Sequence, residues 1–342
     1  MATFLLADAP GPGYVGPPAL TAARVFSSWT LDVPVLVVVL LAGGLYLAGV
    51  RRVRQAGGDW PAIRMVAFYL GGLGVLVLAT MSFIGVYQGV LFYVRSVQTI
   101  LLLLVVPLFT ALGRPITLIT AALPRFGRRL DAVIHSHPAR ILTFPAIPTM
   151  VIVLVPFVLY FSPWYAASMQ SGTVRELTYL ALLIPGFVFF WLFLRVDAVP
   201  RAYPYLVALW VSAGEVVGDA VLGLAVLADQ SLIAGAYYHA LARPWGPSLS
   251  SDQVIGGGAL WVLGDIVGLP FLAAQFIQMI REDETDAVAV DAELDAVEAA
   301  EATVGRVDPA HPGPDPGAPA GSQPWWENDP RFSGRFRRAG DP

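Results

Sequence analysis

Phe92-Tyr-Val-Arg-Ser-Val-Gln-Thr-Ile-Leu-Leu-Leu-Leu-Val-Val-Pro-Leu-Phe-Thr-Ala-Leu-Gly-Arg-Pro115 is the stretch of sequence that decides the fold. It is apolar from Ile100 to Leu112 except for Thr110. A helix from about Val90 to Leu112, rising about 1.5 Å per residue, is long enough to cross the roughly 30 Å hydrocarbon core of a bilayer. The stretch therefore predicts a transmembrane helix, which Pro107 should kink because proline lacks a backbone N–H.

The polar residues near the start of this helix predict a site inside the membrane. Arg95, Gln98 and Thr99 are spaced i, i+3 and i+4, so a helix places them on one face. Lipid cannot satisfy their hydrogen bonds, and we therefore expect this face to point towards other helices or a wet crevice.

The composition places the chain among all-α polytopic membrane proteins. Of its 342 residues, 56% are hydrophobic and only 13% are charged, against about 25% charged in soluble domains. The net charge of −4 offers no basic field for nucleic acid. Cysteine is absent, which excludes disulfides, thiolate zinc sites and iron–sulfur ligation within this chain.

The apolar runs predict a bundle of seven transmembrane helices within residues 31–281, at about 33–50, 65–84, 90–112, 144–161, 176–194, 205–227 and 254–280. Arginines gather after the first span, at Arg51, Arg52 and Arg54, and again between residues 113 and 140. The positive-inside rule then places the N-terminus outside the cell membrane and the C-terminus in the cytoplasm.

Two segments flank the predicted bundle. Residues 1–30 are expected to form an extracytoplasmic N-terminal segment. Residues 282–342 are expected to form an acidic, then Pro-rich, cytoplasmic tail that is mostly disordered, although 282–304 could extend the last helix as a modest amphipathic helix. Trp325 and Trp326, followed by arginines, suit either a docking motif or a disordered tail end, and the sequence leaves this open.

A second pattern, Asp252-Gln-Val-Ile-Gly-Gly-Gly-Ala-Leu-Trp261 followed by Gly264-Asp265, opens the last predicted span. Asp252 is expected to cap a transmembrane helix, and the glycines should permit close helix packing. Asp265 should lie some ten residues into the membrane. A carboxylate at that depth indicates either a functional site or a polar contact between helices.

Two further acidic residues lie within the sixth predicted span. Glu215 and Asp219 are spaced i and i+4 and share a helix face. They suit a metal or proton site, or an ion pair with a cation from another helix. Our hypothesis is that Arg95 pairs with Asp219 or Asp265, because all three are expected in the outer half or near the middle of the membrane.

These patterns resemble those of the CtaG family of multi-span cytochrome c oxidase assembly factors. Members carry a His-x-x-Gln-His run and then an apolar stretch that ends with proline, glycine and proline; here Gln98, Pro107, Gly113 and Pro115 match. Arg95 and Thr99 stand where the two histidines would be. The second run matches at Asp252, Gln253, Gly256, Gly257 and Trp261, with Asp265 in place of a glutamate.

The resemblance implies an assembly factor for a haem–copper cytochrome c oxidase of the respiratory chain, in a family linked to copper insertion. Its partners would be oxidase subunits within the lipid membrane. We assign no metal ligands and no cofactor, because copper prefers imidazole or soft sulfur ligands and the histidines are replaced; copper enters only through the resemblance. His135 and His137 read as surface-loop residues rather than ligands.

We expect no enzymatic activity, since no nucleophile–base set is visible. Two alternatives stay open: a scaffold that holds oxidase subunits without handling metal, and a permease for small molecules or ions that uses Glu215, Asp219 and Asp265. The sequence does not identify the partner oxidase or the oligomeric state.

Overall fold

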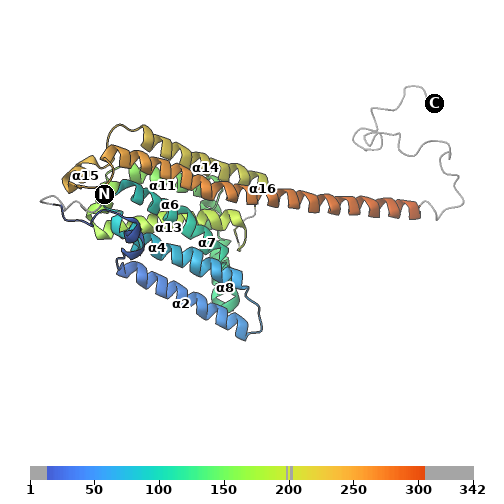
Figure 1. Ribbon diagram of the computed structural model, residues 1–342. Coiled ribbons are helices and arrows are strands. Elements are labelled where there is room, and N and C mark those ends of the chain that lie inside the picture. Colours follow the sequence, from blue (N-terminus) through green and yellow to red (C-terminus); the bar gives the residue numbers. More distant parts are fainter. Residues whose placement is uncertain (1–13, 198, 201–202, 305–342) are drawn as a thin grey trace, which may run out of the picture. The chain divides into compact units, whose positions relative to one another are not determined.

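A computed structural model describes residues 14–197, 199–200 and 203–304. Within these residues the chain is helical and contains no strand. It divides into two compact units, Met1–Ile280 and Arg281–Pro342. In the first unit the long helices run along a common direction, and the short helix α15 (Gly235–Leu241) lies at the opposite end from α8 (Pro115–Ala122) (Figure 1).

In the described part of the chain, six helical segments are long and apolar enough to cross a membrane, which confirms the all-α membrane fold. The first is α2 (Val33–Gln55), and the second runs through α3, the π-helical η1, α4 and α5 (Ala62–Tyr87). The third contains α6, η2 and α7. The others are α13 (Gly172–Leu194), α14 (Tyr205–Ala228) and the apolar part of α16 (Leu249–Val304).

The expected fourth span, 144–161, corresponds to α11 and ends at a bend. Helix α11 covers only Ala146–Tyr160, about 22 Å at 1.5 Å per residue, which is shorter than the bilayer core. After a bend of 69° the chain continues as α12 (Trp164–Gln170). The two helices make a seventh crossing only if they are taken together, and the bend brings α12 over the start of α13.

Pro107 changes the hydrogen-bond pattern of the third span. The span consists of α6 (Phe92–Ile100), the π-helical stretch η2 (Leu101–Val105) and α7 (Val106–Leu112), in which Pro107 occupies the first turn. In a π-helix each backbone N–H bonds to the carbonyl five residues earlier instead of four. Pro107, which has no N–H to donate, lies just after the π-helical stretch ends. The span is also the most buried of the set, and Leu102, Leu103 and Leu104 lie in the main core.

A glycine on α13, Gly186, permits a close contact between helices in that core. A Cβ on Gly186 of α13 would lie 2.0 Å from the carbonyl oxygen of Leu103 and 2.8 Å from Cγ of Pro107. Only a residue without a side chain lets α13 approach η2 and α7 so closely. Around this contact α11 packs on α13 and α14.

The connection at 113–140, expected as a loop, folds into three short helices, the last of which continues to Leu142. They are α8, α9 (Pro124–Ile134) and α10 (His137–Leu142). Arg114 adopts φ +51°, which turns the chain sharply between α7 and α8. The carboxylate of Asp197 accepts hydrogen bonds from the backbone N–H groups of Ile116 and Thr117, so a distant residue caps the start of α8.

The N-terminal segment packs on the α15 end of the first unit. Its short helix α1 (Ala22–Ser27) precedes α2, Tyr87 donates a hydrogen bond to the carbonyl of Pro18, and Tyr14 contacts Trp245 edge-on. In the second unit, α16 remains helical to Val304, so residues 282–304 extend the last helix, which the sequence left as one possibility for them. The Pro-rich stretch and Trp325–Trp326 lie outside the described residues.

Candidate functional site

Arg95, near the start of α6, lies at the centre of a buried polar cluster. Its side chain is 0% exposed. Nη1 donates to Oε1 of Gln88 at 2.8 Å and to Oε1 of Gln98 at 2.6 Å, and Nη2 donates to Oγ of Ser168 at 3.3 Å. The guanidinium carbon also lies 6.0 Å from the ring centre of Tyr179 on α13. Four helical segments therefore converge on one cation.

Hydrogen bonds on the far side of each glutamine fix this arrangement. Nε2 of Gln98 donates to the carbonyl of Ala79 on α4 (Val75–Met81) at 2.7 Å. Nε2 of Gln88, directly after α5 (Phe83–Tyr87), donates to the hydroxyl of Tyr179 at 2.8 Å. Because both amide nitrogens have their own acceptors, both amide oxygens face the guanidinium of Arg95.

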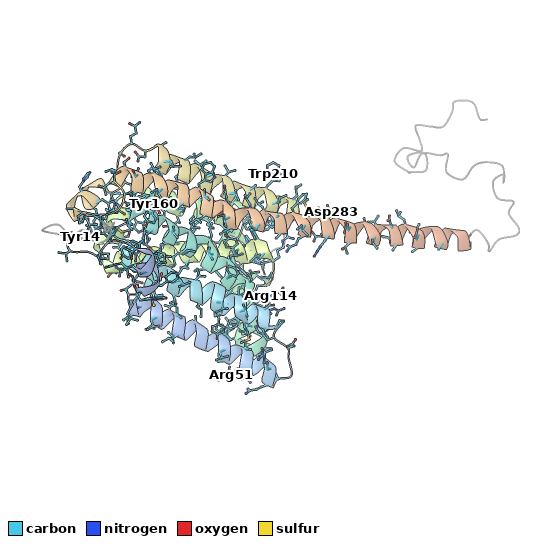
Figure 2. All side chains as sticks on the ribbon, viewed as in Figure 1. Tyr14, Arg51, Arg114, Tyr160, Trp210 and Asp283 are labelled. Carbon is cyan, nitrogen blue, oxygen red and sulfur yellow. The ribbon has the colours of Figure 1, made fainter. Side chains whose placement is uncertain are left out.

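Thr99 belongs to a second layer of the cluster. Its hydroxyl donates to the carbonyl of Arg95 at 3.0 Å and lies 3.1 Å from the hydroxyl of Tyr160, which sits inside the bundle (Figure 2). Beyond it, the hydroxyls of Tyr165 and Tyr238 are 2.8 Å apart. Burial raises the pKa of Tyr238 above its usual range, so this phenol remains a neutral hydrogen-bonding group.

The expected ion pair between Arg95 and Asp219 or Asp265 is wrong. Among the described residues Arg95 makes no ion pair, and its Nε has no hydrogen-bond partner. The reason is direction: its side chain leaves α6 towards Gln88 and α12, whereas the carboxylates belong to α14 and α16. The predicted polar residues thus form two groups, not one.

The second group is a set of carboxylates between α14 and α16. Glu215 and Asp219, one turn apart on α14, are 2% and 3% exposed. Asp265 on α16 directly follows Gly264, which lies against the carboxyl group of Asp219. Each of the three has one buried oxygen without a hydrogen-bond partner in the described structure. This group can hold protons or attract a cation.

Gly264 allows the two helices to meet at these carboxylates. A Cβ at this position would lie 2.5 Å from Oδ2 of Asp219. One turn later, a Cβ on Gly268 would lie 3.5 Å from Oε2 of Glu215. The absence of side chains on this face of α16 leaves the space that the α14 carboxylates occupy.

A buried ion pair joins Arg243 and Asp252, whose side chains are 2% and 1% exposed, with Nη2 and Oδ2 3.2 Å apart. Oδ1 of Asp252 also accepts a hydrogen bond from the backbone N–H of Tyr93 at 3.0 Å. The prediction that Asp252 caps the helix it opens is wrong: Asp252 lies inside α16, and its carboxylate instead caps the start of α6. Through its bond to Tyr93, Asp252 connects the start of α16 to the start of α6, the helix that carries Arg95.

The other motif residues have packing roles. Gln253 donates to the carbonyls of Asp229 and Ser231 and accepts from the N–H of Ile233, so it fastens the end of α14. Glycines allow close approach at the following contacts: Gly256 with Phe92 of α6, Gly257 with Gly223 of α14 beside Trp261, and Gly113 with Phe68 of η1 (Ala67–Gly74). Pro115 is the first residue of α8.

The polar groups of the Arg95 cluster are amides, hydroxyls and a guanidinium. None of these is the imidazole or sulfur ligand that copper prefers, and the fixed positive charge repels a cation. Across the residues with described positions, no three His, Cys, Asp or Glu side chains are grouped closely enough to hold a metal ion. His135 contacts Asp131 in its own short helix.

A comparison with protein families identifies the family of this chain. The model of the family described as cytochrome c oxidase caa3 assembly factor matches residues 44–282, which include both buried polar groups and both sequence motifs. The chain belongs to this family. The chain differs from the family pattern at Arg95 and Thr99. Both residues lie at the centre of the buried cluster rather than at the edge of the cluster.

Similar curated proteins come from mycobacteria. An uncharacterized protein of Mycobacterium leprae is 28% identical over 292 residues, and uncharacterized proteins of Mycobacterium bovis and Mycobacterium tuberculosis are 28% identical over 294 residues. Each alignment covers 83% of this chain but 44% of the relative, so the chain spans less than half the length of these proteins. No solved structure matches the chain significantly.

Sequence reasoning missed the partners of Arg95. Gln88 stands in a turn, and Ser168 and Tyr179 lie 73 and 84 positions after Arg95, in separate helices. The spacing of Gln88 and Arg95, i and i+7, placed both at one end of the span and could have drawn attention to Gln88. No local pattern pointed to Ser168 or Tyr179, because their roles depend on how α12 and α13 pack on α6.

Proposed function

We propose that this chain assists the maturation of a haem–copper cytochrome c oxidase in the cell membrane, with its N-terminus outside and its C-terminus in the cytoplasm. Membership of the assembly-factor family supports the oxidase as the client. The arginines at the end of α2 support the orientation. The chain acts by binding oxidase subunits rather than by catalysis, since its buried polar groups include no nucleophile–base set.

The observation that carries the finer proposal is the Arg95 cluster. The family pattern that the sequence resembles has histidines where this chain has Arg95 and Thr99. Here Arg95 donates hydrogen bonds to Gln88, Gln98 and Ser168, and Thr99 donates to the carbonyl of Arg95. A copper ion would meet a fixed positive charge and oxygen donors at this place. We therefore favour a scaffold that holds oxidase subunits during assembly over a chain that carries copper through this site.

Gene deletion and complementation test the assembly function. Membranes of a deletion strain are expected to lose the haem absorption of the oxidase, and the wild-type gene should restore it. If oxidase haem and copper contents are unchanged by deletion, the assembly function is refuted.

Metal analysis separates the scaffold from copper delivery. The purified protein, incubated with cuprous ion and desalted, is expected to retain no stoichiometric copper, whereas the Arg95→His/Thr99→His double variant, which restores the imidazoles of the family pattern, is expected to retain more. Stoichiometric copper on the wild type would refute the scaffold and support delivery. The variant must first elute as a monodisperse peak, which shows that it folds.

The orientation has a direct test because the chain contains no cysteine. Single cysteines can be introduced at Gly57, after α2, and at Gly89, before α6. In intact cells an impermeant maleimide should label Gly89→Cys and not Gly57→Cys. The opposite pattern would reverse the proposed orientation.

The α14–α16 carboxylates favour a second candidate function, the passage of protons or cations through the bundle. Buried carboxyl groups with unpartnered oxygens inside a membrane span are typical of such pathways. Proteoliposomes with a pH gradient provide the test. Proton flux that is abolished in Asp219→Asn would support this function, and flux no greater than in empty liposomes would refute it.

A further inference from the structure

A second feature of the first unit lies away from both polar groups. A groove of about 720 Å³ separates α2 from α7 and α13, with η1 as its floor and α8 closing one end. Its walls are apolar: Val38 and Leu45 line it from α2, Ile184 and Phe187 from α13, and Leu118 from α8. The contacts of α2 with η1, α4 and α8 lie at the edges of the groove, and the space between these contacts remains open.

The hydroxyl groups inside the groove are already engaged. The phenol of Tyr46 donates to the carbonyl of Gly113 at 2.7 Å, and the hydroxyl of Thr110 donates to the carbonyl of Val106 at 2.7 Å. An occupant of the deep part therefore meets hydrocarbon and finds no free hydroxyl donor there. This surface suits an acyl chain better than a polar ligand.

The charge is confined to one end. Arg52, near the end of α2, is the charged residue among those that line the groove, and in the described part of the chain its exposed side chain makes no hydrogen bond or ion pair. Further exposed arginines gather at this end: Arg51, labelled near the end of α2 in Figure 2, and Arg125, Arg128 and Arg129 on α9. An anionic group at the membrane surface would complement this end of the groove.

We propose that the groove binds one anionic phospholipid, with its acyl chains along α2 and α13 and its phosphate at Arg52. The distribution of charge favours a lipid over a transmembrane helix of a partner, because an apolar groove that ends at an exposed arginine complements acyl chains joined to a phosphate. The volume of the groove falls within the roughly 300–1,000 Å³ of small-molecule sites.

Native mass spectrometry tests the proposal on the full chain. The protein is reconstituted into nanodiscs that contain equal amounts of phosphatidylglycerol and phosphatidylcholine, released into detergent, and analysed for bound lipid. The wild type is expected to retain phosphatidylglycerol preferentially. Arg52→Gln should lower the ratio of bound phosphatidylglycerol to phosphatidylcholine about fivefold, the effect of about one arginine at a membrane surface.

Two matched controls make the result specific to the groove. Arg51→Gln removes the same charge from the neighbouring position, which does not line the groove, and should leave the ratio unchanged. Ala48→Trp places a large ring in the groove and should lower the retention of both lipids. Leu41→Trp, at a 61% exposed position of α2 outside the groove, should not.

Three results would overturn the proposal. Equal losses in Arg51→Gln and Arg52→Gln would show a general surface charge effect rather than a site. Equal retention of both lipids by the wild type would remove the preference for an anionic headgroup. No retained lipid, or retention unaffected by Ala48→Trp, would assign the groove to another occupant such as a helix of a partner protein.

Discussion

Replacement of Gly264 by alanine tests the close packing of α16 on the α14 carboxylates. The new Cβ would lie 2.5 Å from Oδ2, 3.0 Å from Cβ and 3.1 Å from Cγ of Asp219. Ordinary contact begins near 3.4 Å, so the carboxyl group or the helix must move by about 1 Å. Rotation of the Asp219 side chain cannot relieve the contact between the Cβ of Asp219 and the new Cβ at position 264, because this rotation leaves the Cβ of Asp219 in place. The two helices must therefore separate slightly or bend.

The expected magnitude follows from two opposing effects. Overpacking of a buried contact costs about 1–3 kcal/mol, whereas glycine to alanine within a helix gains about 0.8–1.0 kcal/mol in propensity. Gly264→Ala should therefore destabilise the protein by up to about 2 kcal/mol. Gly258 lies on the same helix, and a Cβ there would have no heavy atom within 4 Å. Gly258→Ala should accordingly be neutral or stabilise by up to about 1 kcal/mol.

Thermal unfolding in detergent, followed by the loss of the monodisperse peak in size-exclusion chromatography, measures the difference. The Tm of Gly264→Ala should fall below that of Gly258→Ala by at least about 2 °C. In the Asp219→Ala/Gly264→Ala double variant the carboxyl group is gone and only the contact with the Cβ of residue 219 remains, so the combined loss should be smaller than the sum of the single losses. Equal Tm values for the two glycine variants, or additive losses, would refute the packing described for Asp219.

Three further predictions concern contacts elsewhere in the first unit. Arg243→Met leaves the carboxylate of Asp252 buried without its cation and should destabilise the protein by about 3–5 kcal/mol, which urea unfolding in detergent can measure; a loss below about 1 kcal/mol would contradict a buried pair. Asp197→Ala removes the cap of α8 and should cost about 0.5–2 kcal/mol in the same assay, with a change near zero counting against capping. Gly186→Ala should lower Tm whereas Gly44→Ala, with no atom within 4 Å of its Cβ, should not, and similar values would show that α13 does not contact η2 as closely as described.

The sequence alone determined the class of protein and the position of most spans. Hydrophobic length is a local property, because a helix in lipid must satisfy its backbone hydrogen bonds within its own segment. The predicted ends of the fifth and sixth spans therefore lie within a few residues of α13 and α14. The fourth span, expected at 144–161, likewise lies within two residues of α11, whereas the angle of the bend between α11 and α12 depends on packing against α13 and α14.

The tertiary structure alone decided which polar residues meet. The sequence established that Arg95 and Asp219 are both too deep to remain without polar partners, yet it could not choose between a pair and two separate clusters. That choice depends on the rotation of each helix about its axis and on which helices are neighbours. Arg95 is bound by Gln88 and Ser168 because α6 presents it towards α12, while Asp219 faces the glycine surface of α16. Contacts between helices far apart in the chain fix these directions, and no local pattern in the sequence encodes them.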